Sequence, residues 1–189
     1  GPTTGGTAIT INGTGFASGA TVTLGGAAAT NVVVVSATKL TAKTPAHAAG
    51  QVNVVVTLPS LASVTATNAF TYLAAPSVTG VSPSSGPIAG GTAVTLSGAN
   101  FSSSATLTFG GVATPFTFVS SSQLTAVTPA HAAGAVNVTV VNPDGQSSTL
   151  ANGFTYIAPL GITSITPNTG DPAGGTTVTI PGNSFQAGA

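Results

Sequence analysis

The sequence is poor in charge. Lys and Arg together number two, as do Asp and Glu, so charged side chains make up 2% of its 189 residues. Folded proteins usually carry about a quarter charged residues. Disordered segments combine low hydrophobicity with high net charge, whereas 42% of this chain is hydrophobic and its formal net charge is zero. The composition therefore predicts a folded chain with an uncharged polar surface.

The shortage of basic side chains excludes two classes of partner. Lys39 and Lys43 are the cationic residues of the chain, whereas nucleic-acid binding depends mainly on Lys and Arg that neutralise phosphates. Attraction to anionic lipid fails for the same reason. No apolar run reaches the ~18 residues of a membrane span. We expect no nucleic-acid partner and no membrane insertion by this segment.

Cysteine and methionine are absent. Without cysteine the chain has no disulfide framework, no zinc–thiolate site and no thiol nucleophile. The missing methionine, and the lack of a charged segment followed by an apolar one, indicate that the sequence is not a complete precursor. Two interpretations stay open: the residues are one whole subunit, or they are a window on a longer array.

The chain repeats itself. A block that runs from Gly1 to Phe16 returns at Gly86 to Phe101 and again at Gly170 to Phe185, with spacings of 85 and then 84 residues. Such self-similarity is the signature of tandem repeats. We expect a repeat without its first strand in residues 1–74, a complete repeat in residues 75–157, and the N-terminal part of a third in residues 158–189.

Each repeat has the alternation of β-strands. Thr92–Ser97 and Val136–Val140 alternate polar and apolar side chains, which predicts strands with one buried face. Asn142–Gly145, with the sequence Asn-Pro-Asp-Gly, predicts a turn because proline presets φ and glycine accepts positive φ. About seven short strands in each repeat of about 84 residues, with no helical period, indicate an all-β fold of β-sandwich repeats.

Five spaced blocks of the complete repeat follow a recognisable order: Val78–Gly86, Gly90–Phe101, Phe109–Gly111, Thr128–Val138 and Phe154–Tyr156. These blocks resemble the IPT/TIG family. The resemblance covers essentially the whole chain and implies tandem immunoglobulin-like (E-set) β-sandwiches. It implies no catalytic residue, because the family's motif residues are structural.

The resemblance leaves the function open. Family members bind DNA in some transcription factors, serve as receptor stalks, and occur as repeats in bacterial surface proteins and polysaccharide-active enzymes. The DNA-binding branch uses basic loops that this chain lacks. The near-neutral composition resembles the bacterial surface repeats, so we expect an extracellular or cell-surface location, in a bacterium.

Few side chains could carry chemistry. His47 and His131 occupy equivalent loop positions, and Asp144 and Asp171 are the carboxylates of the chain. A metal site needs three or four converging ligands, and a catalytic base needs a nucleophile and an orienting partner. Neither set can be assembled. We predict that the chain is not an enzyme, that it has no catalytic, cofactor-binding or metal site, and that the histidines bond nearby backbone.

Two apolar segments are candidates for an interface. The turn at residues 58–61 is apolar where the second repeat has Asn142–Gly145, and exposed leucines at a loop tip can mark an interface, although scattered surface leucines are common. The tail at Gly161–Gly170 has the pattern of the first strand that repeat one lacks. The candidate residues are Leu58, Leu61, Ile162 and Ile165.

An uncharged surface does not repel its neighbours, and exposed strand edges then tend to pair. The leading hypothesis is a structural module of an extracellular or cell-surface filament, stalk or adhesin, with itself as partner. The alternative is a glycan-binding accessory module that contacts cell-surface glycans. The tail is able to complete the first repeat of another subunit by strand addition. Residues 174–185 duplicate a strand that repeat one already has, which favours the window on a longer array.

Overall fold

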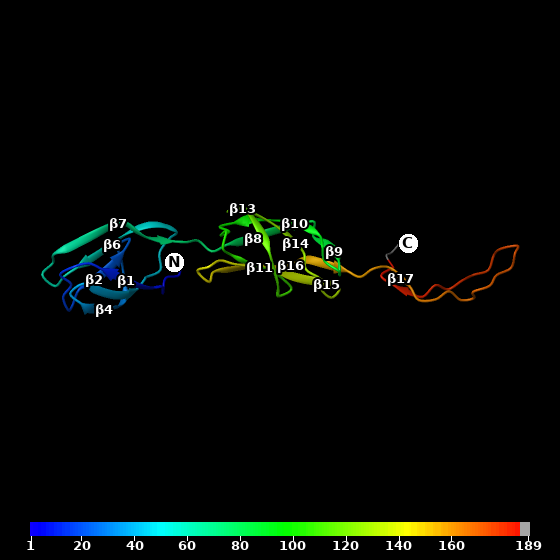
Figure 1. Ribbon diagram of the computed structural model, residues 1–189, viewed down its shortest axis with the longest axis horizontal. Coiled ribbons are helices and arrows are strands. Elements are labelled where there is room, and N and C mark those ends of the chain that lie inside the picture. The colour runs from blue at the N-terminus through cyan, green and yellow to red at the C-terminus, as the bar shows by residue number, and fades with distance from the viewer. Residues whose placement is uncertain (186–189) are drawn as a thin grey trace. The chain divides into compact units, whose positions relative to one another are not determined.

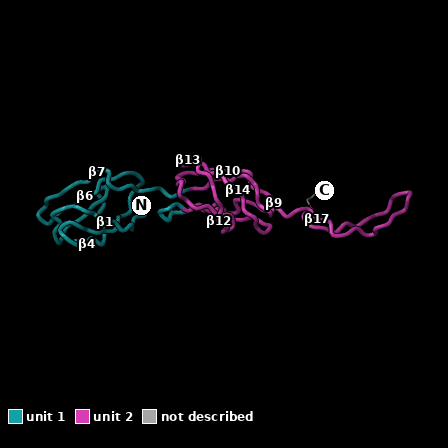
Figure 2. The backbone as a smooth tube through the Cα atoms, viewed as in Figure 1, with its two compact units in different colours: residues 1–76, 142–147 teal, residues 77–141, 148–189 magenta. Residues whose placement is uncertain are grey.

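The computed structural model describes residues 1–185, and all regular elements of that part are β-strands. None of its segments is a helix long and apolar enough to cross a membrane. The residues form two compact units, coloured teal and magenta in Figure 2. The first contains Gly1–Pro76 and Asn142–Ser147, and the second contains Ser77–Val141 and the chain from Ser148 onward.

The first repeat is a sandwich of two antiparallel sheets (Figure 1). One sheet has the strand order β1-β5-β4 and the other has the order β3-β2-β6-β7. The strands are β1 (Ala8–Asn12), β2 (Thr21–Leu24), β3 (Ala27–Ala28), β4 (Thr30–Ser36), β5 (Lys39–Lys43), β6 (Gly50–Thr57) and β7 (Ser63–Tyr72).

The second repeat has the same two layers with one more strand in each (Figure 1). Its sheets have the orders β13-β14-β10-β8 and β12-β11-β15-β16-β9. The strands are β8 (Ser77–Ser82), β9 (Ser85–Pro87), β10 (Ala93–Ala99), β11 (Thr106–Phe109), β12 (Val112–Thr114), β13 (Phe116–Ser120), β14 (Gln123–Val127), β15 (Gly134–Val141) and β16 (Ser147–Ile157).

Alternation along the strands builds one core in each repeat, because successive side chains point to opposite faces of a sheet. In the second repeat Leu96 and Leu124 are directly opposite each other on β10 and β14 and are fully buried. Phe154 packs edge-on against Phe109, with ring centroids 5.6 Å apart. The corresponding core of the first repeat contains Leu24, Leu40 and Tyr72.

The tail forms a short antiparallel pair of β17 (Gly161–Ile162) and β18 (Gly182–Asn183), extended by a bridge between Thr166 and Thr179. Its register is that of β8 and β10 moved along the sequence by one repeat: Ile162 lies opposite Gly182 as Val78 lies opposite Gly98. Within the described residues no second sheet covers this pair. Its five large apolar side chains are therefore exposed: Ile162, Ile165, Val178, Ile180 and Phe185.

The sequence-based prediction of an all-β sandwich fold is confirmed. The predicted turn is also present, since Gly145 has φ 84° and its N–H donates to the Asn142 carbonyl. Two strands of the second repeat were not predicted, β9 and β12. Each has three residues, which is too few to show an alternating pattern.

Candidate functional site

The two histidines have the same structural role in the two repeats. Nδ1 of His47 lies 2.8 Å from the carbonyl oxygen of Ala48, and its ring stacks on Tyr72 with centroids 5.1 Å apart. His131 repeats both contacts with Ala132 and Tyr156. A carbonyl only accepts, so Nδ1 carries the proton. Each imidazole thus packs its loop against the core of its own repeat.

The tyrosines beneath the histidines are buried. The Tyr72 hydroxyl donates to the carbonyl oxygen of Pro45 at 2.8 Å. Burial raises the pKa of both Tyr72 and Tyr156 above the usual value for tyrosine. The hydroxyls of Thr44 and Thr128 act in the opposite direction on those pKa values. Both tyrosines therefore keep their hydroxyl proton at neutral pH, and both side chains belong to the core.

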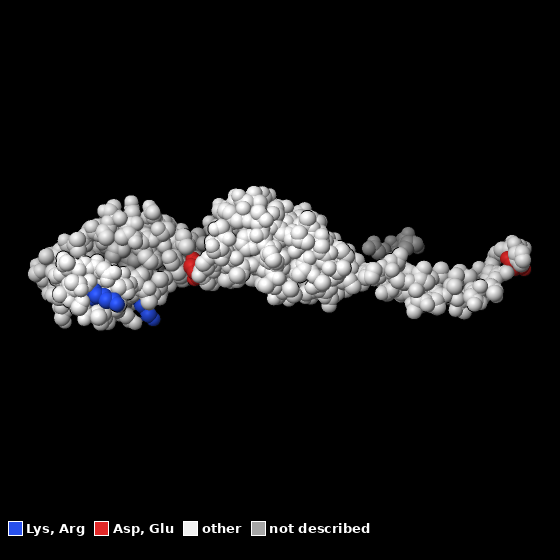
Figure 3. All heavy atoms as spheres, in the orientation of Figure 1, with Lys and Arg blue, Asp and Glu red and all other residues white. Residues whose placement is uncertain are grey.

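The carboxylates are used in turns. Asp144 accepts from the backbone N–H of Gln146 at 3.2 Å and from its side-chain amide at 2.7 Å. Asp171 accepts from the backbone N–H of Ala173 at 2.8 Å. Figure 3 shows few charged atoms on an otherwise uncharged face, and within the described residues no three His, Cys, Asp or Glu side chains form a metal-binding group.

The most distinctive feature is an open strand edge. In the second repeat β10 is paired on both sides, with β14 and with β8. In the first repeat the equivalent strand β1 pairs with β5, and β1 ends its sheet in the described part of the chain. Unpaired backbone N–H and C=O groups along such an edge are a template for another strand.

The orientation of the backbone groups on this edge follows from hydrogen bonds. Thr179 and Thr166 exchange two bonds, of 2.8 and 2.9 Å, so both backbone groups of Thr179 point to the first strand of its pair. Thr10 is equivalent to Thr179 by its place in the repeat. On the other side, the carbonyl oxygen of Thr7 and the N–H of Gly13 bond toward β5. Directions alternate along a strand, so both Thr10 backbone groups face outward.

The apolar side chains beside this edge are only partly covered. Ile9 and Ile11 are half-buried and pack against the core of the first repeat. Their equivalents in the second repeat, Val94 and Leu96, are buried. β8 adds Val78 and Val81 to the core of the second repeat, and no strand of the described residues supplies such side chains to the first repeat.

A glycine marks where the neighbouring strand passes. A Cβ on Gly98 would overlap the carbonyl oxygen of Ser77, and a Cβ on Gly182 would overlap that of Gly161. At the equivalent Gly13 the atoms within reach belong to the Phe16 ring. The ring of a phenylalanine lies against this glycine in all three repeats, whereas the strand carbonyl is present in the second and third.

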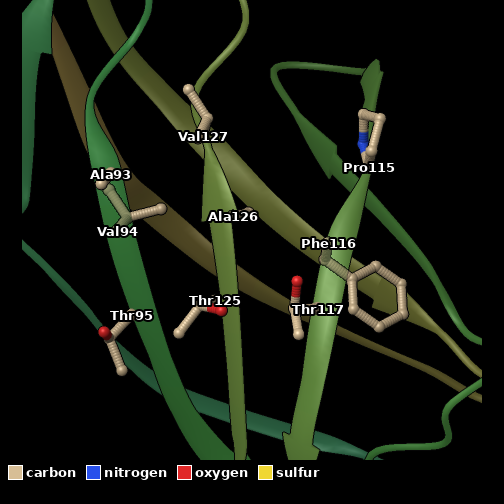
Figure 4. A pocket seen from close by; sticks show the side chains of 9 residues that line it. All are labelled: Ala93, Val94, Thr95, Pro115, Phe116, Thr117, Thr125, Ala126 and Val127. Atoms are coloured by element: carbon tan, nitrogen blue, oxygen red, sulfur yellow. The ribbon is translucent and has the colours of Figure 1, made fainter.

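The second candidate site is a shallow hollow of about 480 Å³ on the outer face of the β10-β14-β13 sheet. Figure 4 shows Thr95, Thr125 and Thr117 on three neighbouring strands, with Pro115 and Phe116 on the β13 side. Thr125 lies opposite both other threonines in the strand register. The arrangement offers three hydroxyl groups on one face of the sheet, while Phe116 packs against the core of the second repeat.

The sequence-predicted interface residues are in two places. Leu58 is half-buried against the core of the first repeat, whereas Leu61 is 84% exposed. Leu61 has φ 64°, a conformation that its counterpart Gly145 adopts without strain. Ile162 and Ile165, on the first strand of the tail pair, are 67% and 48% exposed. Thr10 and Gly13 on the open edge were not among the predicted interface residues, because their pattern is the same in the paired strand of the second repeat.

The chain is therefore a tandem array of immunoglobulin-like β-sandwiches, and its loop histidines are structural. The family model for the IPT/TIG domain matches residues 1–72, 76–156 and 159–189. The chain belongs to the IPT/TIG family.

The curated relatives include a nematode plexin and a human fibrocystin-like protein. Plexin-2 of Caenorhabditis elegans is 40% identical over 108 residues, which cover 55% of this chain and 6% of the relative. Human fibrocystin-L is 27% identical over 185 residues, which cover 96% of this chain and 4% of the relative. The chain thus spans a small part of these proteins. They support an extracellular or cell-surface setting.

A solved structure shares the fold. The full extracellular region of plexin A4 matches with a TM-score of 0.50 and 23% identity, covering 88% of this chain and 15% of that one. This likeness shows the fold alone.

Proposed function

We propose that the chain is a structural, non-catalytic segment of a bacterial filament, stalk or adhesin shaft outside the cell. The observation that carries the proposal is that His47 and His131, the residues best suited to chemistry, serve packing in both repeats. The histidine of each repeat stacks on a core tyrosine and bonds its own loop. We propose residues 1–74, 75–157 and 158–189 as the repeats, and strand edges and apolar or threonine-rich faces as the surfaces that assemble.

The partner of such a segment is another copy of itself or a neighbouring repeat. Its two lysines lie in β5, and two cations form no surface able to neutralise a phosphate backbone. The proposal therefore includes neither a nucleic-acid partner nor a cofactor. Repeat arrays are quasi-one-dimensional, and their length is set by the number of repeats.

Pulling single molecules by their two ends tests the structural role. We expect separate unfolding events for the two sandwiches, each releasing roughly 250 Å of chain, because about 75 extended residues at 3.3–3.6 Å each span that length. A chain that extends without resisting force would contradict the proposal.

Glycan binding is the second candidate, and the hollow in Figure 4 is the observation that favours it. Its three threonine hydroxyls are groups that hydrogen-bond to sugars. Binding on a glycan array that is lost in Thr125→Val, and retained in Thr41→Val of the first repeat, would establish this function for the second repeat. An array without bound glycans would leave the structural role as the function.

A further inference from the structure

We propose that the outer face of the β1-β5-β4 sheet binds a saccharide that carries carboxylates, with Lys43 and Lys39 pairing with the negative charges. This binding activity goes beyond the proposed structural role and does not depend on it. Both lysines of the chain lie in β5, where Leu40 and Ala42 are buried. Successive side chains of a strand alternate between its faces, so Lys39, Thr41 and Lys43 share the outer face.

The two cations have no partner within the described residues. Neither lysine takes part in a salt bridge or a side-chain hydrogen bond there. The carboxylates of the chain are engaged elsewhere: Asp144 accepts from Gln146, and Asp171 accepts from the N–H of Ala173. Figure 3 shows the cationic side chains exposed on the surface of the first repeat. An anion that reaches this face therefore meets two uncompensated positive charges.

A hollow beside Lys43 gives the face a place for a sugar ring. Its volume is about 260 Å³, and its lining comes from β1, β5 and the start of β4. Thr10 and Thr41 lie opposite each other in the strand register, and Asn31 belongs to the same lining. Their hydroxyl and amide groups both donate and accept hydrogen bonds, as sugar hydroxyls do. The hollow thus places hydrogen-bonding groups beside a positive charge.

The second repeat has the corresponding hollow without the charge. The hollow of about 480 Å³ in Figure 4 has Val127 at the position of Lys43, and Pro115 at that of Asn31. In that repeat β10 is paired on both sides. The hollow is therefore a property of the sheet face and does not depend on an unpaired edge of β1. The difference in charge makes the first repeat the one that fits an anionic sugar.

The charges and the hydroxyls together select a polymer of uronic acids. A carboxylate beside Lys43 accepts a charge-assisted hydrogen bond, which is about twice as strong as one between neutral groups. Lys39 lies four residues away, about 14 Å along the strand, so a second carboxylate of the same polymer can reach it. Two lysines are too few for a nucleic acid, whose affinity comes from neutralising many phosphates. A polyuronic acid instead presents single carboxylates on hydroxyl-rich rings.

Titration calorimetry of the whole chain with polygalacturonate at low salt tests the site. The control is the methyl ester of the same polymer, which keeps the rings and hydroxyls but lacks the charge. We expect the acid to bind, the affinity to fall as salt screens the exposed charges, and the ester to bind about tenfold more weakly. Equal binding of acid and ester, or no binding of the acid, would overturn the proposal.

The two corresponding hollows supply matched variants. Lys43→Val gives the first repeat the residue of the second and should weaken binding of polygalacturonate about fivefold. Val127→Lys should add a second binding site to the chain. Both positions are exposed, so the sandwiches should fold unchanged. A Lys43→Val chain that binds as tightly as the original would overturn the proposal but not the structural role, which the pulling experiment tests independently.

Polyglutamate tests whether charge alone is recognised. It carries carboxylates without sugar hydroxyls, so it cannot use the hydrogen-bonding groups of Thr10, Thr41 and Asn31 in the same way. We expect it to bind several-fold more weakly than polygalacturonate. Equal affinities would overturn the saccharide as the ligand class and would indicate an acidic peptide instead.

Discussion

The first and second repeats share a core and a histidine loop, but they differ at one edge. Leu96 of the second repeat is fully buried between β14 and β8. Ile11 occupies the same position in the first repeat and is half-buried, because nothing in the described chain pairs with the outer edge of β1. Ile180, the counterpart in the tail, is 42% exposed.

These three positions show that a repeat sequence alone does not set burial. The side chain is apolar each time and lies on the inner face of a strand of the same pattern. Its environment depends on how many of the other strands are present around it. The comparison therefore separates what a strand's own sequence contributes to burial from what the neighbouring strands contribute.

Truncation to alanine at Leu96, Ile11 and Ile180 should give the largest changes in the free energy of unfolding. The loss should decrease in that order. Leu96→Ala should lower the free energy of unfolding of the second repeat by about 3 kcal/mol, because it creates a cavity in a closed core. Ile11→Ala should cost the first repeat about 1 kcal/mol, since less surface is lost from a half-exposed site. Urea denaturation, with hydrogen exchange to separate the repeats, measures both.

Ile180→Ala is the control of that series and should leave both repeats within experimental error. Equal losses for Leu96→Ala and Ile11→Ala would mean that the edge of β1 is covered in solution.

Alanine substitutions of the edge glycines should follow the same order, with the larger loss of stability in the second repeat. Gly98→Ala should destabilise the second repeat by about 2 kcal/mol, because its Cβ overlaps the Ser77 carbonyl and displaces β8. Gly13→Ala should cost about half as much, since its Cβ meets the Phe16 ring, which can shift. Thermal unfolding of the two variants checks the order, and a larger loss for Gly13→Ala would contradict it.

The hairpin turns offer an exchange experiment. Leu61→Gly should stabilise the first repeat by about 1 kcal/mol, because a leucine in the left-handed region carries a steric cost of that size. Gly145→Leu should destabilise the second repeat by a similar amount. Opposite signs in urea denaturation are the expected result, and a loss of stability in Leu61→Gly would show that the Leu61 side chain packs in solution.

The smallest effect concerns alkaline pH. Burial raises the pKa of Tyr72 in the folded chain, so the unfolded chain loses this proton first as the pH passes about 10. The stability that the neutral hydroxyl contributes is present below that pH and is lost as the pH rises toward the folded-state pKa. Tyr72→Phe should make the stability of the first repeat fall less between about pH 8 and pH 11, and an unchanged slope would contradict the assignment.

The alternation of Thr92–Ser97 was enough to predict a strand with one buried face, and β10 has that form. The turn at Asn142–Gly145 was equally local, since proline and glycine restrict a few dihedral angles. β9 was not predictable in this way, because its three residues pair in parallel with β16, about seventy residues along the chain.

The candidate site was predicted on one side only. The tail isoleucines Ile162 and Ile165 stand out in the sequence, because their pattern matches the strand that the first repeat lacks. Thr10 and Gly13, on the outer edge of β1, have the same residue pattern as paired strands elsewhere in the chain. Their role depends on what is absent beside them, which no local pattern records.

The sequence by itself determined the all-β class and the tandem repeats, because these follow from composition, period and side-chain type. The tertiary structure decided which strand edge is open, which apolar residues stay exposed, and that the histidines serve packing. The physical reason is that hydrogen-bond pairing and burial depend on partners far apart in the chain. The same apolar residue is therefore core in one repeat and surface in another.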